Sequence, residues 1–188
     1  MARWAPNTRE RLRAAALALF EERGYAATTV PDIVARAGVT RRTFFRHFAD
    51  KREVFFDGDE IPELAARMIA TAPAHLAPMT VVAQGLHSLA RERFEPRRAE
   101  ICFARSVIAA EPALRERDLR KQADLRDAIR RGFTARGEDE RTAAAVAGIT
   151  VEALQSALDA WASDVDEVPL TDHLDAAFDR MRAVLRVG

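Results

Sequence analysis

The sequence predicts an all-α protein, and three observations lead to that fold class. Apolar residues recur three and four positions apart along most of the chain, which is the pattern of helices with one buried side. No stretch alternates apolar and polar residues over the length of a strand. Proline and glycine mostly separate the periodic segments, as expected at helix ends. We expect nine helices and no internal repeat.

The composition bounds the class of protein. The chain has 188 residues, 48% of them hydrophobic, which suffices for one domain of ordinary size or two small ones. It has no apolar run of membrane-spanning length and no signal-like N-terminal stretch. Cys102 is the only cysteine, so no internal disulfide can form, which is typical of the reducing cytoplasm. Its thiol is either a redox sensor or a small buried apolar group.

Charge is distributed unevenly along the chain. Residues 1–52 hold eleven Arg and Lys against five Asp and Glu, whereas residues 53–188 hold eighteen against twenty-four. A basic N-terminal part on an acidic remainder is the asymmetry expected if only the N-terminal part meets a polyanion. A phospholipid surface is the rival polyanion, but the first helix has no broad apolar side to insert into it.

The first helix is expected from about Thr8 to Gly24. Apolar residues recur on one of its sides as far as Phe20, and Gly24 can end it in the left-handed conformation. This helix is expected to bury the backs of the two that follow. Before it, residues 1–6 form a short arm that either reaches along DNA or is frayed.

Residues 28–48 predict two short helices joined by a tight turn. Thr29 is an N-cap candidate with Asp32 three residues later, which is the spacing of a capping box. Pro31 falls in the first turn, where its missing N–H costs little. Gly38 can end the helix and start the turn.

The second of these helices combines an apolar back with a basic front. Thr40 can cap it, and Phe44 and Phe48 are four residues apart and so share one face. Two such helices around a glycine turn form the helix–turn–helix pattern. Arginine can bond bidentately to guanine and threonine can contact a base edge, so we expect the front to enter a major groove. The alternative is a helical hairpin whose basic face is merely solvated. The residues expected to contact DNA are Thr29, Pro31, Thr40, Arg41, Arg42, Thr43, Phe45, Arg46, His47 and Lys51.

The stretch from residue 16 to residue 54 resembles the N-terminal domain of TetR-type transcriptional repressors. Phe45 departs from the pattern, because the family more often has Tyr there, and so a hydroxyl contact to phosphate is not available. The residues that carry the resemblance are Ala16, Leu19, Phe20, Gly24, Tyr25, Thr28, Thr29, Val30, Asp32, Ile33, Ala37, Gly38, Val39, Thr43, Phe44, His47, Phe48 and Lys51.

The remaining helices follow from the same periodicity. Asp50 can cap a fourth helix, which a Gly and a Pro at residues 57–62 break or kink before it resumes. This break is either a point of signal transmission or a local irregularity. Later helices are expected from about Thr80 to Phe94, from Pro96, from Pro112 to about Ala135, from about Asp139 to Ala162, and from Pro169 onward.

The resemblance implies a division of labour and two binding surfaces. It implies a helix–turn–helix DNA-binding domain at residues 1–52 and an effector-binding and dimerisation domain at residues 53–188. Family members bind a small-molecule effector among their middle helices and pair through their last two helices. The expected pocket residues are Met68, Leu86, His87, Phe94, Cys102, Phe103 and Trp161; packed core is the alternative for each. The expected dimer residues are Leu154, Leu158, Trp161, Leu174, Phe178 and Met181, whose alternative is a core pair within a monomer.

Chemistry of other kinds has little support in the sequence. None of the four histidines stands with Cys, Asp or Glu at a metal-binding spacing, and no glycine-rich phosphate loop or strained serine turn is present. We therefore expect no enzyme activity, no cofactor and no metal. The favoured interpretation is a cytoplasmic, homodimeric DNA-binding regulator, a repressor released by a ligand. The alternative is a helical ligand-binding or interaction protein whose basic part contacts RNA or an acidic protein.

Overall fold

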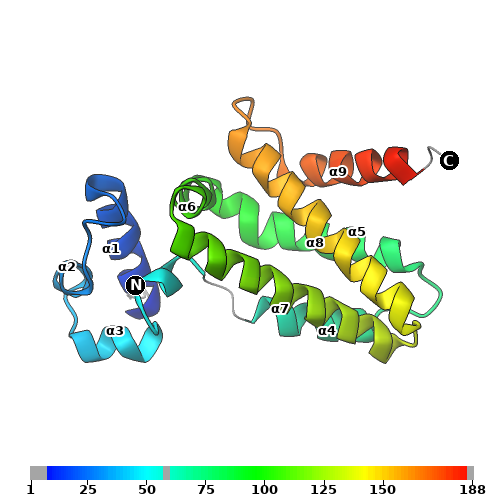
Figure 1. Ribbon diagram of the computed structural model, residues 1–188, viewed down its shortest axis with the longest axis horizontal. Coiled ribbons are helices and arrows are strands. Elements are labelled where there is room, and N and C mark those ends of the chain that lie inside the picture. Colours follow the sequence, from blue (N-terminus) through cyan, green and yellow to red (C-terminus); the bar gives the residue numbers. More distant parts are fainter. Residues whose placement is uncertain (1–7, 57–59, 186–188) are drawn as a thin grey trace, which may run out of the picture. The chain divides into compact units, whose positions relative to one another are not determined.

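The computed structural model describes residues 8–56 and 60–185, and its regular structure over these residues is helical, without a strand (Figure 1). The all-α class is confirmed. The chain divides into two compact units, Met1–Gly58 and Asp59–Gly188. The arm at residues 1–6 and the part of the expected break at residues 57–59 lie outside the described residues.

The N-terminal unit contains α1 (Thr8–Arg23), α2 (Val30–Ala37), α3 (Arg41–His47) and one 3₁₀ turn, η1 (Lys51–Val54). The expected capping box opens α2: the Asp32 carboxylate accepts from the Thr29 backbone N–H at 2.9 Å, and the Thr29 hydroxyl accepts from the Asp32 N–H at 3.4 Å. Gly38 ends α2 with φ of 64°, the left-handed conformation that glycine adopts without strain. Both ends of α2 are thus fixed by local sequence.

The core of this unit reaches beyond the boundary expected at residue 52. Phe55 is buried and stacks on Phe20 of α1, with ring centroids 4.9 Å apart, and Val54 is fully buried beside them. These residues belong to η1 and its end, so the N-terminal unit extends to Gly58. In place of the helix expected to start at Asp50, the chain forms the 3₁₀ turn η1. The Asp50 carboxylate caps this turn by accepting from the Arg52 N–H at 2.7 Å.

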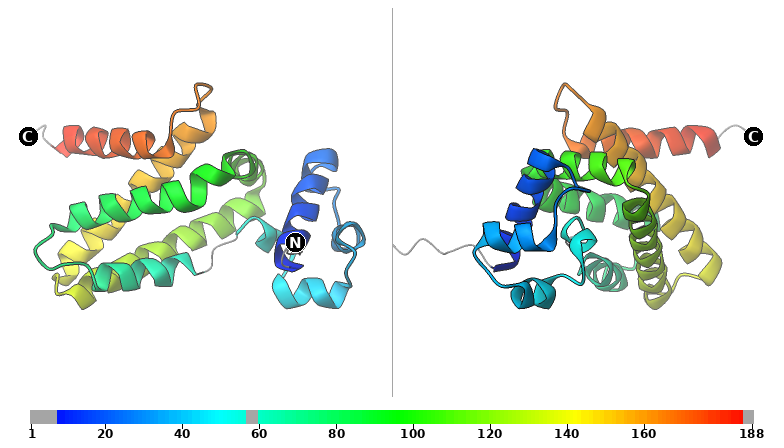
Figure 2. Two further views of the ribbon diagram at one scale, coloured as in Figure 1. Left: turned by 180° about the vertical axis from the view of Figure 1, so that it is seen from behind. Right: turned by 60° about the vertical axis from the view of Figure 1, so that its left-hand side comes forward.

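The C-terminal unit contains α4 (Ile61–Ala70), α5 (Pro78–Leu89), α6 (Arg98–Ala110), α7 (Pro112–Arg136), α8 (Glu140–Ser163) and α9 (Leu170–Leu185) (Figure 2). In it α7 packs against α4 and α8, and α8 also packs against α9. The fifth expected helix, to Phe94, ends earlier: α5 passes into a π-helical turn (Ala90–Phe94) and a 3₁₀ turn (Glu95–Arg97). Pro96 lacks the N–H that a continuing α-helix needs, which explains the change.

Two arginines tie loops to the helices of the C-terminal unit. The Arg98 guanidinium donates to the carbonyls of Trp161 at 3.1 Å and Asp164 at 2.7 Å, at the end of α8. Arg136, at the end of α7, donates to the carbonyls of Pro73 at 2.8 Å and Leu76 in the loop between α4 and α5. Both satisfy carbonyls that the ends of helices and loops leave without partners.

Candidate nucleic-acid interface

Helix α3 is anchored by its apolar back. Phe44 is fully buried and Phe48 nearly so, and the two rings contact each other with centroids 5.5 Å apart. At the start of α3 the Thr40 hydroxyl accepts from the Thr43 N–H at 3.2 Å. The anchoring and the cap leave the opposite face of α3 turned to solvent.

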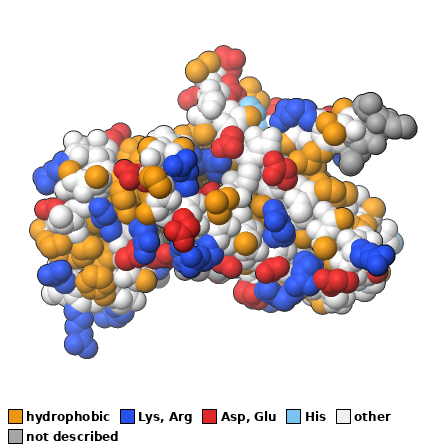
Figure 3. All heavy atoms as spheres, viewed as in Figure 1, with side chains coloured by type: hydrophobic (Ala, Val, Ile, Leu, Met, Phe, Trp, Pro, Cys, Tyr) orange, Lys and Arg blue, Asp and Glu red, His pale blue; other side chains and the backbone are white. Residues whose placement is uncertain are grey.

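That outer face carries three arginines. Arg41, Arg42 and Arg46 are exposed, and within the described part of the chain none of them makes a hydrogen bond or ion pair. Figure 3 shows Lys and Arg side chains projecting at the edge of the N-terminal unit where Figure 1 places α3. The positive charge of α3 is therefore not neutralised by neighbours.

Two arginines elsewhere in this unit are engaged with carboxylates. Arg36 pairs with Glu22 at 2.5 Å and Arg52 pairs with Asp50 at 2.5 Å. The arginines of α3 differ from these two positions. The two pairs also mean that the net charge of residues 1–52 overstates what is available to a polyanion.

Three arginines of α1 serve the fold of the unit. Arg9 donates to the carbonyl of His47 at 2.7 Å, Arg11 to that of Ala37 at 2.6 Å, and Arg13 to that of Val54 at 3.3 Å. These carbonyls lie at the ends of α3, α2 and η1, where backbone acceptors lack helical partners. Sequence reasoning missed this role, because spacing on α1 alone does not tell which arginines face the neighbouring helix ends.

Phe45 is an apolar side chain among these arginines. Its side chain is 51% exposed, the only large hydrophobic residue exposed to this extent within residues 8–56, and its ring meets Phe44 edge-on at 5.4 Å. A large apolar ring held in water on a basic face is the kind of feature that a partner covers.

The threonines and the proline of the expected contact set lie at the starts of α2 and α3. Thr29 and Pro31 are exposed at the start of α2, and Thr40 and Thr43 hold each other through their hydroxyls at 3.0 Å. The Thr29 hydroxyl donates to the Asp32 carboxylate at 2.5 Å, and this bond lowers the pKa of Asp32 below its ordinary value. The capping box therefore stays formed at neutral pH.

Lys51 and His47, two of the expected DNA contacts, have surroundings within the N-terminal unit that the sequence did not indicate. The Lys51 ammonium donates to the carbonyls of Tyr25 at 2.7 Å and Thr28 at 2.8 Å and lies 4.0 Å from the centre of the Tyr25 ring. His47 is half-buried, and its Nε2 is buried without a partner among the described residues. Lys51 thus ties the turn before α2 to η1.

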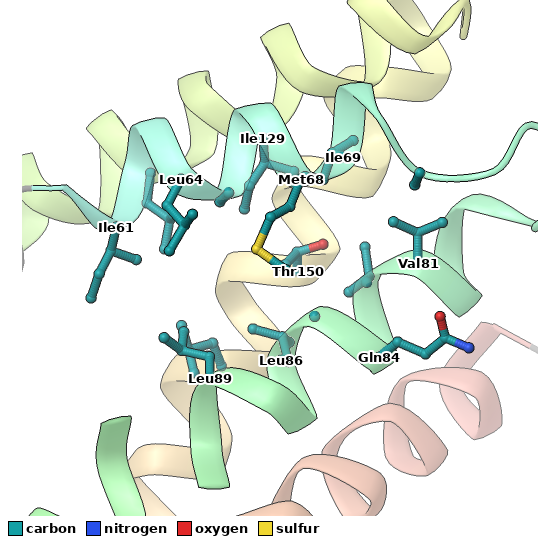
Figure 4. A pocket seen from close by; sticks show the side chains of 16 residues that line it. Ile61, Leu64, Met68, Ile69, Val81, Gln84, Leu86, Leu89, Ile129 and Thr150 are labelled. Atoms are coloured by element: carbon teal, nitrogen blue, oxygen red, sulfur yellow. The ribbon is translucent and has the colours of Figure 1, made fainter. Parts of the chain in front are cut away.

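The C-terminal unit contains a cavity of about 250 Å³ between α4, α5, α7 and α8 (Figure 4). Its lining is aliphatic apart from Gln84, Gly85 and Thr150. Met68, 47% exposed, and Gln84, also exposed, belong to the lining, so the cavity reaches solvent beside them.

Two of the seven expected pocket residues, Met68 and Leu86, line this cavity, and five do not. Trp161 is buried beneath the Arg98 guanidinium, 4.9 Å from it, and Cys102 and Phe103 are half-buried on α6. The other two also lie elsewhere: His87 Nε2 is 3.0 Å from Asp175 Oδ1 of α9, and Phe94 closes the π-helical turn. The lining comes mainly from α4 and α5. Their apolar spacing was visible in the sequence, but the sequence did not show which helices lie next to them.

The expected dimer residues are placed inside their own chain. Leu154, Leu158, Trp161, Leu174 and Phe178 are buried in the core of the C-terminal unit, and Met181 is half-buried against it. Side chains that fill the core of one protomer are not free to pack against another, which argues against the five buried residues as dimer contacts, whereas the assignment of Met181 stays a prediction. The broad apolar pattern of α8 and α9 reflects their contact with each other and with α7.

The described residues contain no group of three His, Cys, Asp or Glu side chains that could hold a metal ion. None of the described helices combines the length and apolar character that crossing a bilayer requires.

An anchored two-helix element with an outward basic helix defines a helix–turn–helix protein, and comparison with known proteins specifies its kind. The model of the family "Bacterial regulatory proteins, tetR family" matches residues 12–57. The HTH-type transcriptional repressor BepR of Brucella suis is 37% identical over 87 residues, which cover 42% of this chain and 42% of BepR. The chain thus spans less than half the length of the first curated relatives that it matches.

Similarity over most of the chain is weaker. The putative mycofactocin biosynthesis transcriptional regulator MftR of Mycobacterium tuberculosis is 28% identical over 187 residues, which cover 90% of this chain and 87% of MftR. Among solved structures, the SmeT–triclosan complex has a TM-score of 0.60 at 20% identity and covers 94% of this chain and 90% of SmeT, which shows a shared fold. The matches to residues 12–57 and to BepR confirm, for the N-terminal part of the chain, the resemblance to TetR-type regulators read from the sequence.

Proposed function

We propose that this chain is a homodimeric transcriptional repressor that binds a palindromic operator through α3 and leaves it when a small molecule occupies the cavity. The observation that carries the proposal is the state of α3: three arginines with no partner among residues 8–56 and 60–185, on a helix held from behind by Phe44 and Phe48. The family match to residues 12–57 supports it independently.

The arrangement suits base reading in a duplex. A B-DNA major groove admits an α-helix, and an arginine can bond bidentately to guanine O6 and N7. Because Phe44 already holds α3 in place, DNA binding does not cost the entropy of ordering this helix. Arg41 and Arg42 are therefore already in position before DNA binds. A-form RNA has a major groove too narrow for side chains to read, so a duplex of DNA is the better partner.

A pair of chains is proposed because one seven-residue helix reads only a few base pairs. Two copies related by a two-fold axis would read a palindrome with half-sites about one turn, 34 Å, or a multiple apart. The outer faces of α8 and α9 are open for this pairing and rich in small residues that let helices approach closely. The small residues of these faces are Ala144, Ala145, Gly148, Ala176 and Ala183.

Release by a ligand is proposed from the cavity of the C-terminal unit. SmeT, which shares the fold, was solved with triclosan. A ligand releases DNA only if it binds the DNA-free conformation more tightly than the DNA-bound one. The division of labour between the two units is part of this proposal.

Selection from a random duplex library tests the proposal without knowledge of the operator. The full chain is incubated with random 30-base-pair DNA at moderate salt, and bound sequences are enriched and read. Enrichment of an inverted repeat supports a homodimer that binds a palindromic operator. A pool that remains random, or RNA that competes as well as the selected DNA, contradicts it and favours the RNA- or protein-binding alternative.

A further inference from the structure

The chemistry of its lining limits which ligands the cavity of the C-terminal unit can bind. It lies within one unit of the chain, and no charged side chain and no histidine belongs to its lining among the described residues. Of its two polar side chains, Gln84 is exposed, whereas Thr150 is 96% buried at its inner wall. Figure 4 shows Met68 on α4 and Thr150 on α8 among the side chains that line the cavity.

Water is poorly held in such a space. A buried water needs two to four polar partners, and an aliphatic lining supplies few. An engineered apolar cavity of about 150 Å³ stays dry and takes up benzene. The cavity of about 250 Å³ is larger, and by that comparison it accommodates about ten non-hydrogen atoms.

The lining also determines which polar groups a ligand can carry. An ionised group loses hydration here and finds no opposite charge, so charged ligands are disfavoured. The Thr150 hydroxyl donates its proton to the carbonyl of Val146 at 2.7 Å, and its oxygen therefore remains as an acceptor. A ligand hydroxyl or N–H can donate to that oxygen.

We propose, on the basis of the ligand-release function above, that the effector is an uncharged and largely hydrocarbon molecule of about ten non-hydrogen atoms with one hydrogen-bond donor for Thr150. Two aliphatic walls, α4 on one side and α5 on the other, enclose its apolar part. The same lining disfavours anionic amphiphiles and cationic compounds.

The chain offers a substitution that fills the cavity. A Cβ added at Gly85, which belongs to the lining, meets no atom within 4 Å. Gly85→Leu therefore adds four carbons to the space without a steric clash at the Cβ and also removes a helix-disfavouring glycine from α5. Ala123→Leu, on an exposed position of α7 outside the lining, is the matched control.

Calorimetric titration of the full chain at pH 7.5 tests the class of ligand. The uncharged probes are 1-nonanol and 2-naphthol, and the charged ones are nonanoate and nonyltrimethylammonium. We expect each charged probe to bind at least tenfold more weakly than 1-nonanol. Gly85→Leu should weaken 1-nonanol binding at least tenfold without lowering the thermal midpoint of the free protein, while Ala123→Leu leaves 1-nonanol binding unchanged. Equal binding of a charged probe, no binding of either alcohol, or alcohol binding unaffected by Gly85→Leu overturns the proposal.

Thr150→Val tests the hydrogen bond. It should weaken the binding of 2-naphthol about two- to tenfold and leave the binding of naphthalene unchanged, because only naphthol has a proton to donate. Equal losses for both compounds would remove Thr150 from ligand recognition.

The same probes separate this inference from the function on which it rests. The affinity of the full chain for the selected duplex is measured with and without saturating 1-nonanol. If the alcohols bind and DNA affinity stays the same, the ligand class stands and the release function fails. If nonanoate binds in place of the alcohols and releases DNA, the release function stands and the ligand class fails.

Discussion

Gly132 of α7 and Ala66 of α4 bring two helix backbones into direct contact. A Cβ added at Gly132 would lie 2.8 Å from the carbonyl oxygen of Ala66 and 3.0 Å from the Cβ of Ile69. The atom met first is backbone, which cannot swing aside as a flexible side chain would. Because α4 supplies five of the lining residues of the cavity, its position against α7 also sets one wall of that cavity.

Gly132→Ala should destabilise the chain by about 1–3 kcal/mol, because overpacking outweighs the roughly 1 kcal/mol by which alanine favours a helix. Denaturant unfolding of the full chain measures this change. Gly85→Ala is the control, since a Cβ at Gly85 meets nothing within 4 Å, and it should be neutral or stabilising. A Gly132→Ala protein as stable as the Gly85→Ala protein would mean that α4 is free to move away from α7.

Lys51 is expected to act on the N-terminal unit before it acts on DNA. Lys51→Met keeps the aliphatic stem and removes both hydrogen bonds to the Tyr25 and Thr28 carbonyls, so stability should fall by about 1–3 kcal/mol. Hydrogen exchange should show reduced protection around residues 25–30. The control is Arg46→Met, which removes an exposed cation of α3 and should change stability by less than about 0.5 kcal/mol. Unchanged exchange in Lys51→Met would restore the view that this ammonium serves phosphate alone.

Phe45 is expected to contact a thymine methyl group or the sugar edge of the operator. Replacing thymine by uracil one position at a time removes a single methyl, which should weaken binding by about 0.8 kcal/mol where the ring packs on it. Phe45→Ala should bind the thymine and uracil duplexes equally at that position. Fluorescence anisotropy with the selected duplex measures both. If the wild-type chain tolerates uracil at every position, Phe45 does not read thymine.

The proposed pairing through the outer faces of α8 and α9 predicts that bulk at Gly148 separates the protomers. A Cβ at Gly148 meets nothing within 4 Å of its own chain, so Gly148→Leu should fold normally and sediment as a monomer. Ala123→Leu on α7 should leave the dimer intact. A charge at Trp161 or Phe178 is not a useful probe, since both are buried in the core of one chain and such a variant would unfold. Persistent dimers of Gly148→Leu would place the interface elsewhere.

Local sequence determined the parts of the fold that local chemistry controls. The capping box of Thr29 and Asp32, the left-handed Gly38 and the shared face of Phe44 and Phe48 all follow from spacing within one or two turns. The exposed arginines of α3 followed from the same pattern.

What the sequence did not reveal depends on neighbours that are distant along the chain. The amphipathic pattern marks Trp161 and Leu154 as buried, but it does not tell whether the partner helix belongs to the same chain or to a second copy. Lys51 and Arg11 look alike as surface cations until backbone carbonyls from other elements are placed beside them. The cavity required the relative positions of four helices, which periodicity does not contain.

The central claim is that Arg41 and Arg42 read bases, and anisotropy titration of single alanine variants on the selected duplex tests it most directly. Arg41→Ala and Arg42→Ala should each weaken binding to that duplex by about 1–3 kcal/mol and weaken binding to an unrelated duplex much less. Arg36→Ala, whose guanidinium is already paired with Glu22, should bind both duplexes nearly as the wild-type chain does. Wild-type affinity and wild-type sequence preference in both the Arg41 and Arg42 variants would contradict the account.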